Sequence, residues 1–512
     1  MAINSIGSSV SVLGQSVANI KSQLTNLQTQ LSTGEKATTY AGMGTGEQFA
    51  IAARSQLAEI SGYQNTITNV GTTISAANSA LQGLVNISGQ VETAASGGAL
   101  TVNSNGQTTA QTSAVSELGT MLAMLNTQSG TGYIFSGNAT NTAPVASADA
   151  ILNGNGGQAG LTQVISERQQ ADLGGASDPG RLVVTGPTVT APTTVSLAED
   201  VAGSPFGMKL SSVTSTLTGA TVTGPTGSPA AISVALGATN PNSGDQVNFT
   251  FNMPDGTTQT VQLTATTTSP PPSGSFLIGS TPAATAGNLQ TALQSSISTV
   301  ANTTLVASSA MEASSNFFGS PPLRVNTTPP ATAATATSLV AGTSTNTVFW
   351  YTGGGATTPG SARGSQVAQI ASGQTVQYGI QANEQGISSQ LQAIAAFAAF
   401  STTPSNTNAT AQVSALSASV TQALSTQQPG QQSMEDIQSD LANVQTTMSA
   451  VTSQQTQAQT NLQSMVSNIE TVSSDQVASQ ILALQTNLQA SYETTSMLSQ
   501  LDLVKYLPTP SA

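Results

Sequence analysis

Apolar residues at both ends of this chain recur at alternating steps of three and four residues. The series at the start consists of Ile3, Ile6, Val10, Leu13, Val17, Ile20, Leu24, Leu27 and Leu31. The series near the other end consists of Ile437, Leu441, Val444, Met448, Val451, Leu462, Met465, Ile469 and Val472, with Gln455 and Ala458 at two intervening positions. This spacing gives a helix one narrow apolar stripe, and such a stripe requires a partner helix. We therefore expect both ends to be helices that pack against other helices.

The first helix is predicted over residues 1–32 and has little to stabilise it alone. Lys21 is its only basic residue, and its remaining positions are largely Ser, Gln, Asn and Thr. Those residues are mediocre helix formers, and few charge pairs link successive turns. We expect this helix to form mainly when it is packed against a partner.

A second long helix is predicted from about residue 47 until Gly97 and Gly98 end it. Further helices are predicted over 108–128, from about 380 to 397, over 413–424 and over 433–506, and a short strand or hairpin at Tyr133–Phe135. The core positions predicted for the long helices are Arg54, Ile60, Ile67, Ile74, Leu81, Leu84, Ile437, Leu441, Val444, Met448, Val451, Leu462, Met465 and Ile469. The positions predicted for association of the last helix are Leu484, Leu488, Leu498 and Leu501.

The middle of the chain, residues 138–364, is rich in Pro, Gly, Thr and Val and contains strand patterns. Residues 246–252 and 259–263 alternate polar and apolar around Pro254, Asp255 and Gly256, which predicts a hairpin. Residues 182–186 predict another strand, and residues 288–300 a helix. We expect one or two β-rich domains with small helices.

The helices of the two ends are predicted to pack on each other, because each has a stripe and neither has another partner. The predicted fold class is α+β: a long antiparallel α-helical coiled-coil rod built from both termini, with β-rich domains inserted at its tip. An alternative is that each end forms a separate coiled-coil dimer.

Composition excludes several kinds of site. The chain has no Cys and no His, which excludes disulfides, cysteine nucleophiles and histidine-based catalytic or zinc sites. Nine basic residues are scattered among twenty-two acidic ones, for a net charge of −13, so we expect no nucleic-acid or membrane partner. We predict no enzyme, no metal and no cofactor. The start lacks the features of a cleaved secretory signal, and we expect none to be used.

Arg54 lies among small and apolar residues of the second helix. It is predicted to be an intersubunit or intrachain anchor that pairs with a carboxylate such as Glu47 or Glu59, with a plain surface arginine as the alternative. Trp350 lies beside Phe349 and Tyr351, and core packing is the favoured interpretation over ligand binding.

Four short segments of the chain resemble motifs of a known bacterial protein family. Residues 31–36 (LSTGEK) resemble the turn after the first flagellin helix, and Phe49–Leu57 resembles a segment with a family arginine, which falls on Arg54. Residues 133–137 (YIFSG) resemble the family element YLFSG, and 378–384 (YGIQANE) resemble the return into the C-terminal core of alphaproteobacterial members. The match covers about 1–137 and 365–507, whereas 40–46 departs from the usual DDAAG-like stretch.

The resemblance implies a subunit that polymerises into the flagellar filament for swimming motility. It implies filament-core helices at 1–32 and 475–512, helical parts at 33–137 and 365–474, and an outward-facing variable region at 138–364. The implied partners are other copies of the chain, the hook-associated and cap proteins, and an export chaperone at the C-terminal helix. The implied location is extracellular, in the filament, after type III export.

Two alternatives stay open. Residues 488–507 look closer to the end of the hook–filament junction protein (hook-associated protein 3), a relative with the same core, although its insertion is usually smaller than 138–364. A type III-secreted adhesin is the alternative from a different class, and it would not need the tail beyond 475 for polymerisation.

Overall fold

The structure is a computed structural model that describes residues 3–355, 361–425 and 430–500. Side chains are described within these ranges except for 3–11 and 498–500. The fold is α+β with long helices, as predicted. The described residues form two compact units: unit 1 holds 3–69, 369–375 and 446–500, and unit 2 holds 70–355, 361–368, 376–425 and 430–445. The unit boundaries fall inside α2 (Glu47–Gly97), inside α10 (Met434–Glu470) and in a short hairpin.

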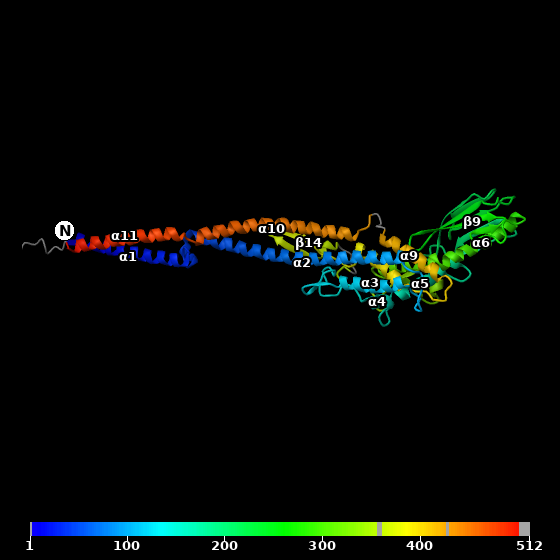
Figure 1. The fold of residues 1–512 in the computed structure, drawn as a ribbon, viewed down its shortest axis with the longest axis horizontal. Helices are drawn as coiled ribbons and strands as arrows, with labels where there is room; N and C mark the ends of the chain where they lie inside the picture. Colours follow the sequence, from blue (N-terminus) through cyan, green and yellow to red (C-terminus); the bar gives the residue numbers. More distant parts are fainter. Residues whose placement is uncertain (1–2, 356–360, 426–429, 501–512) are drawn as a thin grey trace, which may run out of the picture. The chain divides into compact units, whose positions relative to one another are not determined.

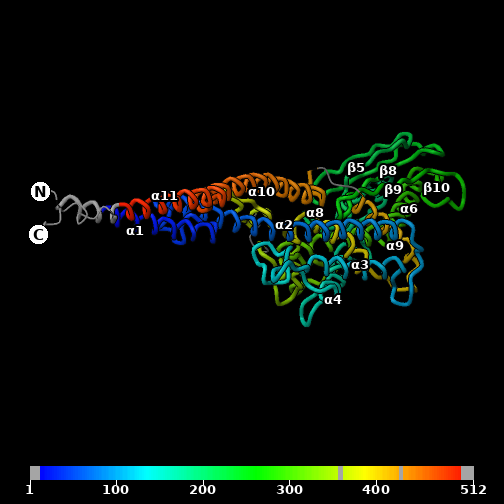
Figure 2. Tube along the Cα trace, turned by 60° about the vertical axis from the view of Figure 1, so that its left-hand side comes forward, coloured from blue at the N-terminus to red at the C-terminus, as the bar shows by residue number. Residues whose placement is uncertain are grey.

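Unit 1 contains the helices of both chain ends. They are α1 (Ile3–Thr33), the short η1 (Tyr40–Gly46), the first part of α2, the last part of α10, and α11 (Ser474–Gln500). Helix α1 contacts α11, and the two run in opposite directions (Figures 1 and 2). An antiparallel bridge between Glu35 and Thr471 places the end of α1 beside the start of α11.

The helical region predicted over 433–506 consists of two helices in its described part. Helix α10 ends at Glu470 and α11 begins at Ser474, with a non-helical break between them. The break exists because Val472 N donates to Gly34 O (3.1 Å) and Lys36 N donates to Glu470 O (2.7 Å). These bonds pair the two helix connections of unit 1 and take the backbone away from helical geometry. Residues 501–506 of the prediction lie outside the described part.

The helices of unit 2 build a closely packed group. Besides the rest of α2 and the start of α10, they are α3 (Thr109–Leu125), α4 (Ala148–Asn153), α5 (Leu161–Leu173), α7 (Thr304–Phe317), α8 (Gln385–Ala399) and α9 (Ala409–Ser425). Helix α7 contacts α5, α8 and α9, and α8 also contacts α3. Most residues of α7 and α8 are buried, and both are rich in Ala and Ser, which allows close approach of neighbouring helices.

The β-rich part of unit 2 has two four-stranded sheets. One has the order β3-β4-β7-β6, from strands Leu182–Thr185, Thr194–Glu199, Ala231–Ala235 and Thr221–Thr226. The other has the order β10-β9-β8-β5, from strands Ser275–Leu277, Thr258–Thr266, Gln246–Asn252 and Lys209–Ser215. Helix α6 (Pro282–Asn302) contacts strands of both sheets. The sheets and the helix therefore share one hydrophobic core.

The alternation of apolar and polar residues along the strands explains which face of each strand packs against the core. Val247, Phe249 and Phe251 of β8 are buried, whereas the residues between them point outward. The predicted hairpin is confirmed: β8 pairs antiparallel with β9, and Gly256 supplies the positive φ of +80° in the turn. The strand predicted over 182–186 is confirmed as β3, and the helix predicted over 288–300 begins earlier, at Pro282, behind a Thr281 cap.

Short elements complete the described chain. They are the hairpin β1 (Gln128–Ser129) and β2 (Gly132–Tyr133), the pair β11 (Leu323–Val325) and β12 (Leu339–Ala341), the pair β13 (Val367–Ala371) and β14 (Gln374–Gln377), and the 3-10 turns η2 (Pro179–Arg181), η3 (Ala333–Thr335) and η4 (Arg363–Ser365). Tyr133 lies in β2, in agreement with the strand or hairpin predicted there.

Candidate functional site

The contact between α1 and α11 covers its apolar residues only in part. The α1 side chains of the predicted series that are partly buried are Leu13, Val17, Ile20, Leu24 and Leu27. In the described part of α1, no side chain is fully buried. Leu31 ends the series and is 43% exposed. One partner helix is thus enough to orient the stripe of α1 and not enough to cover it.

The surface of α11 that packs against α1 includes residues that were not predicted from the sequence. Leu484 and Leu488 were predicted, and both are partly buried. Val477 and Ile481 are the most buried residues of this helix, and they were not among the predicted positions. They extend the predicted series backward at steps of four and three, so the same spacing could have found them. The side chains of Ile3, Ile6, Val10 and Leu498, and the whole of Leu501, lie outside the described residues.

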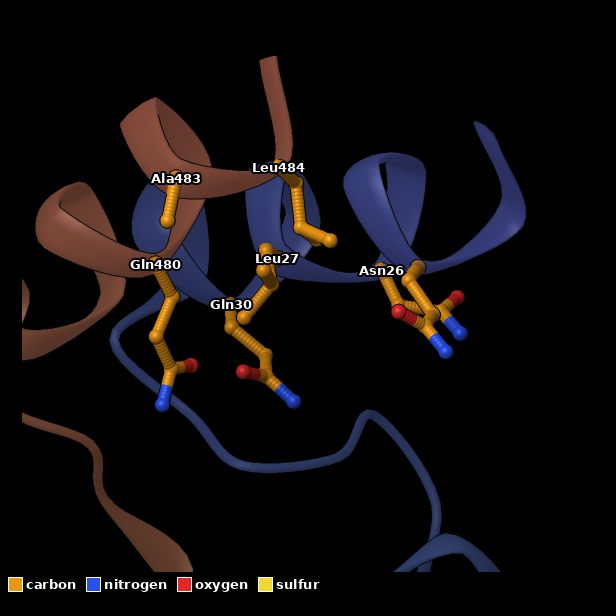
Figure 3. A pocket seen from close by; sticks show the side chains of 7 residues that line it. Asn26, Leu27, Gln30, Gln480, Ala483 and Leu484 are labelled. Atoms are coloured by element: carbon orange, nitrogen blue, oxygen red, sulfur yellow. The ribbon is translucent and has the colours of Figure 1, made fainter. Parts of the chain in front are cut away.

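A groove of about 440 Å³ lies where α1 and α11 meet. Figure 3 shows Leu27 of α1 with Ala483 and Leu484 of α11, and glutamines from both helices at the edge. The residues that line it are Gln23, Asn26, Leu27, Gln30, Gln480, Ala483 and Leu484. No charged side chain lines this groove, so its chemistry suits an apolar or amide-bearing surface.

Unit 1 also exposes large apolar side chains on α11 and α2. Leu482 and Met497 of α11 are each 64% exposed, and Phe49 at the start of α2 is 62% exposed. Single exposed apolar residues are ordinary on a protein surface. Several of them on helices whose own apolar stripe is half covered indicate a surface that associates with further protein.

The connection between α1 and α2 and the connection between α10 and α11 are held together by an ion pair and by backbone hydrogen bonds. Arg54 Nε donates to Glu470 Oε1 at 2.8 Å, and Arg54 Nη2 donates to Glu470 Oε2. This two-bond geometry is the strong form of an arginine–carboxylate pair. The predicted role of Arg54 as an intrachain anchor is therefore confirmed, but its expected partner was wrong. The carboxylate comes from the end of α10, a region that is distant in sequence, and not from Glu47 or Glu59.

The ion pair between Arg54 and Glu470 shifts the pKa of each group so that its charged form is favoured. The hydrogen bond to Glu470, followed by the charge of that carboxylate, raises the pKa of Arg54. The hydrogen bond from Arg54 lowers the pKa of Glu470 from its ordinary value. The Arg54 side chain is 54% exposed, so solvent screens the attraction, and the bond geometry matters more than the charge alone.

Most predicted core positions of the long helices are buried or partly buried. Fully or nearly fully buried are Ile74, Leu81, Leu84, Ile437, Leu441, Met448 and Val451. Partly buried are Ile60, Ile67, Val444, Leu462 and Ile469. Within unit 1, α2 and α10 also share a hydrogen bond from Gln64 Nε2 to Gln459 Oε1 (3.4 Å).

Met465 and Arg54 are the wrong members of the predicted set, because Met465 is 39% exposed and the Arg54 side chain is 54% exposed. The covered face of α10 passes through Gln455, Gln459, Leu462 and Val466 instead of Ala458 and Met465. Gln455 is buried because its Nε2 donates to Ile370 O at 2.6 Å. The specific partners of these two glutamines thus decide which face of α10 is buried. The spacing of apolar residues alone cannot reveal such polar contacts.

Most basic side chains are held inside the chain's own ion pairs. Those in ion pairs are Arg54, Arg168, Arg181, Lys209, Arg324 and Arg363. Arg168 and Arg181 also stack over the ring of Phe206. Most of the positive charge is therefore neutralised by carboxylates of the same chain, and the remaining acidic residues give the chain its net negative charge.

Trp350 belongs to the core of unit 2. It is 3% exposed, and its indole N–H donates to Phe318 O at 2.9 Å. Its ring packs against Phe318 and Tyr351. Burial raises the pKa of the Tyr351 hydroxyl, which donates to Gly354 O. Core packing, the favoured interpretation, is confirmed.

Among residues 3–355, 361–425 and 430–500, no group of three or more acidic side chains is placed to hold a metal ion. None of the described helices has the length and apolarity to cross a bilayer. Compared with known proteins, the chain matches no protein-family model, no curated protein and no solved structure.

Proposed function

We propose that this chain is a structural subunit of the flagellin type, which polymerises into a bacterial flagellar filament for swimming. The observation that carries the proposal is the incomplete cover of the α1–α11 pair. In a single copy, the side chains of Leu24 and Leu27 are partly exposed, and those of Leu482 and Met497 are exposed. Burying one such side chain fully is worth about 1.5–3 kcal/mol, so contacts with further copies would be strongly favourable.

The finer architecture belongs to the same proposal. The helices of both termini would form an antiparallel coiled-coil rod, with α1 and α11 in the filament core and residues 138–364 facing outward. The half-covered stripe supports this arrangement, because a helix pair with apolar surface on two sides fits between neighbours. The four segments that resemble flagellins give the second line of support.

The proposal brings with it the partners of such a subunit. Other copies of the chain would be the main partner, with hook-associated and cap proteins at the filament ends. An export chaperone would cover the apolar surface of α11 before assembly, and type III export would deliver the chain outside the cell. The role is structural and involves no catalysis.

Electron microscopy of sheared surface appendages, combined with mass spectrometry of their protein, tests the proposal. The expected result is micrometre-long filaments in which this chain dominates. Confinement of the chain to the hook end, as a trace component, would establish the junction protein instead. Absence from all appendages, with retained surface binding after deletion of residues 475–512, would establish the adhesin.

A further inference from the structure

Three Asn–Gly pairs occur in the chain, and their surroundings differ. They are Asn105–Gly106, Asn153–Gly154 and Asn155–Gly156. Such a pair is chemically unstable, because the main-chain nitrogen of Gly meets no Cβ when it approaches the Asn side-chain carbonyl carbon. The reaction requires that this nitrogen be free and that the local backbone can turn toward the side chain. Structure therefore decides which pair reacts.

The first pair is locked. Gly106 N donates to Asn103 O at 3.0 Å, and Gly106 O accepts from Thr402 N at 3.0 Å. Gly106 is buried, and a Cβ built on it would lie 1.8 Å from Thr402 O. Backbone rotation at Asn105–Gly106 would have to break both hydrogen bonds and displace the neighbouring chain.

The second pair is also locked, at the end of α4. Gly154 N donates to Ala150 O at 2.9 Å, as the last hydrogen bond of the helix. The reactive side chain is occupied as well, because Asn153 Nδ2 donates to Asp149 Oδ1 at 2.7 Å. The backbone nitrogen of Gly154 and the side-chain amide of Asn153 are therefore both held in other hydrogen bonds.

The third pair is open. Asn155 and Gly156 are exposed, and a Cβ built on Gly156 would meet nothing within 4 Å. Within the described part of the chain, neither the side-chain amide of Asn155 nor the backbone N–H of Gly156 forms a hydrogen bond. The turn is closed only by Asn155 N to Gln158 O (3.2 Å) and Gln158 N to Asn155 O (3.0 Å). Glycines at 154, 156 and 157 give this turn wide backbone freedom.

We propose that Asn155 is a site of spontaneous deamidation in the folded protein. Gly156 N attacks Asn155 Cγ, the bond from Cγ to the amide nitrogen breaks, and ammonia leaves with the proton that Gly156 N gives up. Water then opens the cyclic imide. Opening at Cγ yields aspartate, and opening at the main-chain carbonyl yields isoaspartate, in which the chain runs through the β-carbon. Neither oxidant nor enzyme is required.

The product changes the surface next to α4 (Figure 1). Each converted chain gains one negative charge, and isoaspartate adds one atom to the main chain inside a four-residue turn. The Asn155–Gln158 bridge cannot keep its geometry with that extra atom. Gln158 Nε2 donates to Ser344 O, and Ala159 N donates to Asn346 O at 2.9 Å, so the change reaches the loop at 343–347.

Incubation of the full, folded chain at neutral pH, followed by peptide mass spectrometry after digestion at mildly acidic pH, tests the proposal. Conversion is read as the mass gained when the amide becomes an acid, and isoaspartyl peptides are resolved by chromatography. We expect Asn155 to convert at least about tenfold faster than Asn105 or Asn153, since these must first break a backbone hydrogen bond and open a packed turn.

The same chain held unfolded in urea is the matched control, because there all three pairs should convert at similar rates. Conversion of Asn105 or Asn153 as fast as Asn155 in the folded chain overturns the proposal. Lack of conversion at Asn155 in the folded chain, while all three convert in urea, overturns it as well. Gly156→Ala should slow the reaction in both states, because the added Cβ hinders the attack.

Discussion

At the scale of single residues, most of the few basic side chains of this protein form ion pairs within the chain. Arg54 joins the start of α2 to the end of α10 through Glu470. The backbone beside it is paired by the Glu35–Thr471 bridge. One arginine therefore closes a connection across more than four hundred residues of sequence.

Glu470→Gln should weaken unit 1 in a pH-dependent way. The folded-state pKa of Glu470 lies below the ordinary value of 4.5, so its stabilisation is present above that pH and is lost as the pH falls through the lowered pKa. Thermal unfolding should thus show a lower midpoint for Glu470→Gln at about pH 7, and the gap to the native protein should be smaller at a pH below the ordinary pKa of 4.5. Glu59→Gln, on the exposed face of α2, serves as the control and should leave the midpoint unchanged. An equal gap at both pH values would contradict this role for the ion pair.

Two glycines of similar φ should differ in their tolerance of alanine. Gly106 (φ +77°) has the Thr402 carbonyl where a Cβ would lie, whereas Gly256 (φ +80°) faces open space. Gly256→Ala should cost only the left-handed backbone penalty, about 1–2 kcal/mol. Gly106→Ala should cost about 3 kcal/mol or more, because the clash adds to that penalty. Urea unfolding of both variants measures the difference, and equal costs would show that the 106–402 contact is not rigid.

At the scale of elements, α1 and α6 show what a helix gains from its surroundings. Leu293 of α6 is fully buried in the core shared by two sheets, whereas Leu24 of α1 is only partly covered by α11. The two helices have similar polar composition and similar apolar spacing. Their difference in burial therefore comes from the number of partners and not from helix propensity.

The same substitution should consequently act on different properties in the two helices: on single-chain stability in α6 and on association in α1. Leu293→Ala should cost about 2–5 kcal/mol of unfolding free energy in the single chain. Leu24→Ala should cost less than about 1 kcal/mol in the single chain and should raise the concentration needed for association. Hydrogen exchange of the single chain and light scattering of the concentrated protein separate the effects. A large loss of single-chain stability from Leu24→Ala would show that α1 needs no further partner.

Periodicity made the long helices and the β8–β9 hairpin predictable, because their burial follows one repeating pattern. It could not predict the break at 471–473, which depends on backbone bonds to Gly34 and Lys36. It also placed Met465 inside, since the polar contacts of Gln455 and Gln459 set the true phase of α10. Arg54 could be singled out from its apolar surroundings, but its partner Glu470 could not, because only the fold brings them together.

At the scale of the whole molecule, the net negative charge acts against the association of copies. The chain carries a net charge of −13, and most of its basic side chains are held in internal ion pairs. Copies that associate therefore bring like charges together. The apolar stripes must overcome this repulsion, which falls off within about 8 Å at physiological salt.

Association should accordingly speed up with ionic strength. Raising the salt from about 0.01 M to about 0.15 M shortens the screening length from about 30 Å to about 8 Å, and we expect faster growth of light scattering from the purified chain. Sodium chloride and potassium chloride should act alike if screening is the cause. Slower association at higher salt would indicate that attractive ion pairs between copies drive assembly.

Electron microscopy of the purified chain under assembly conditions tests whether the half-covered stripe of α1 and α11 binds further copies. We expect filaments for the native chain and for Thr260→Asp, an exposed site on β9, and none for Leu24→Asp or Leu484→Asp. Circular dichroism should show that all four single chains keep the fold of unit 2. Filaments from the Leu24→Asp and Leu484→Asp chains, or no filaments from the native chain, would contradict this role of the stripe.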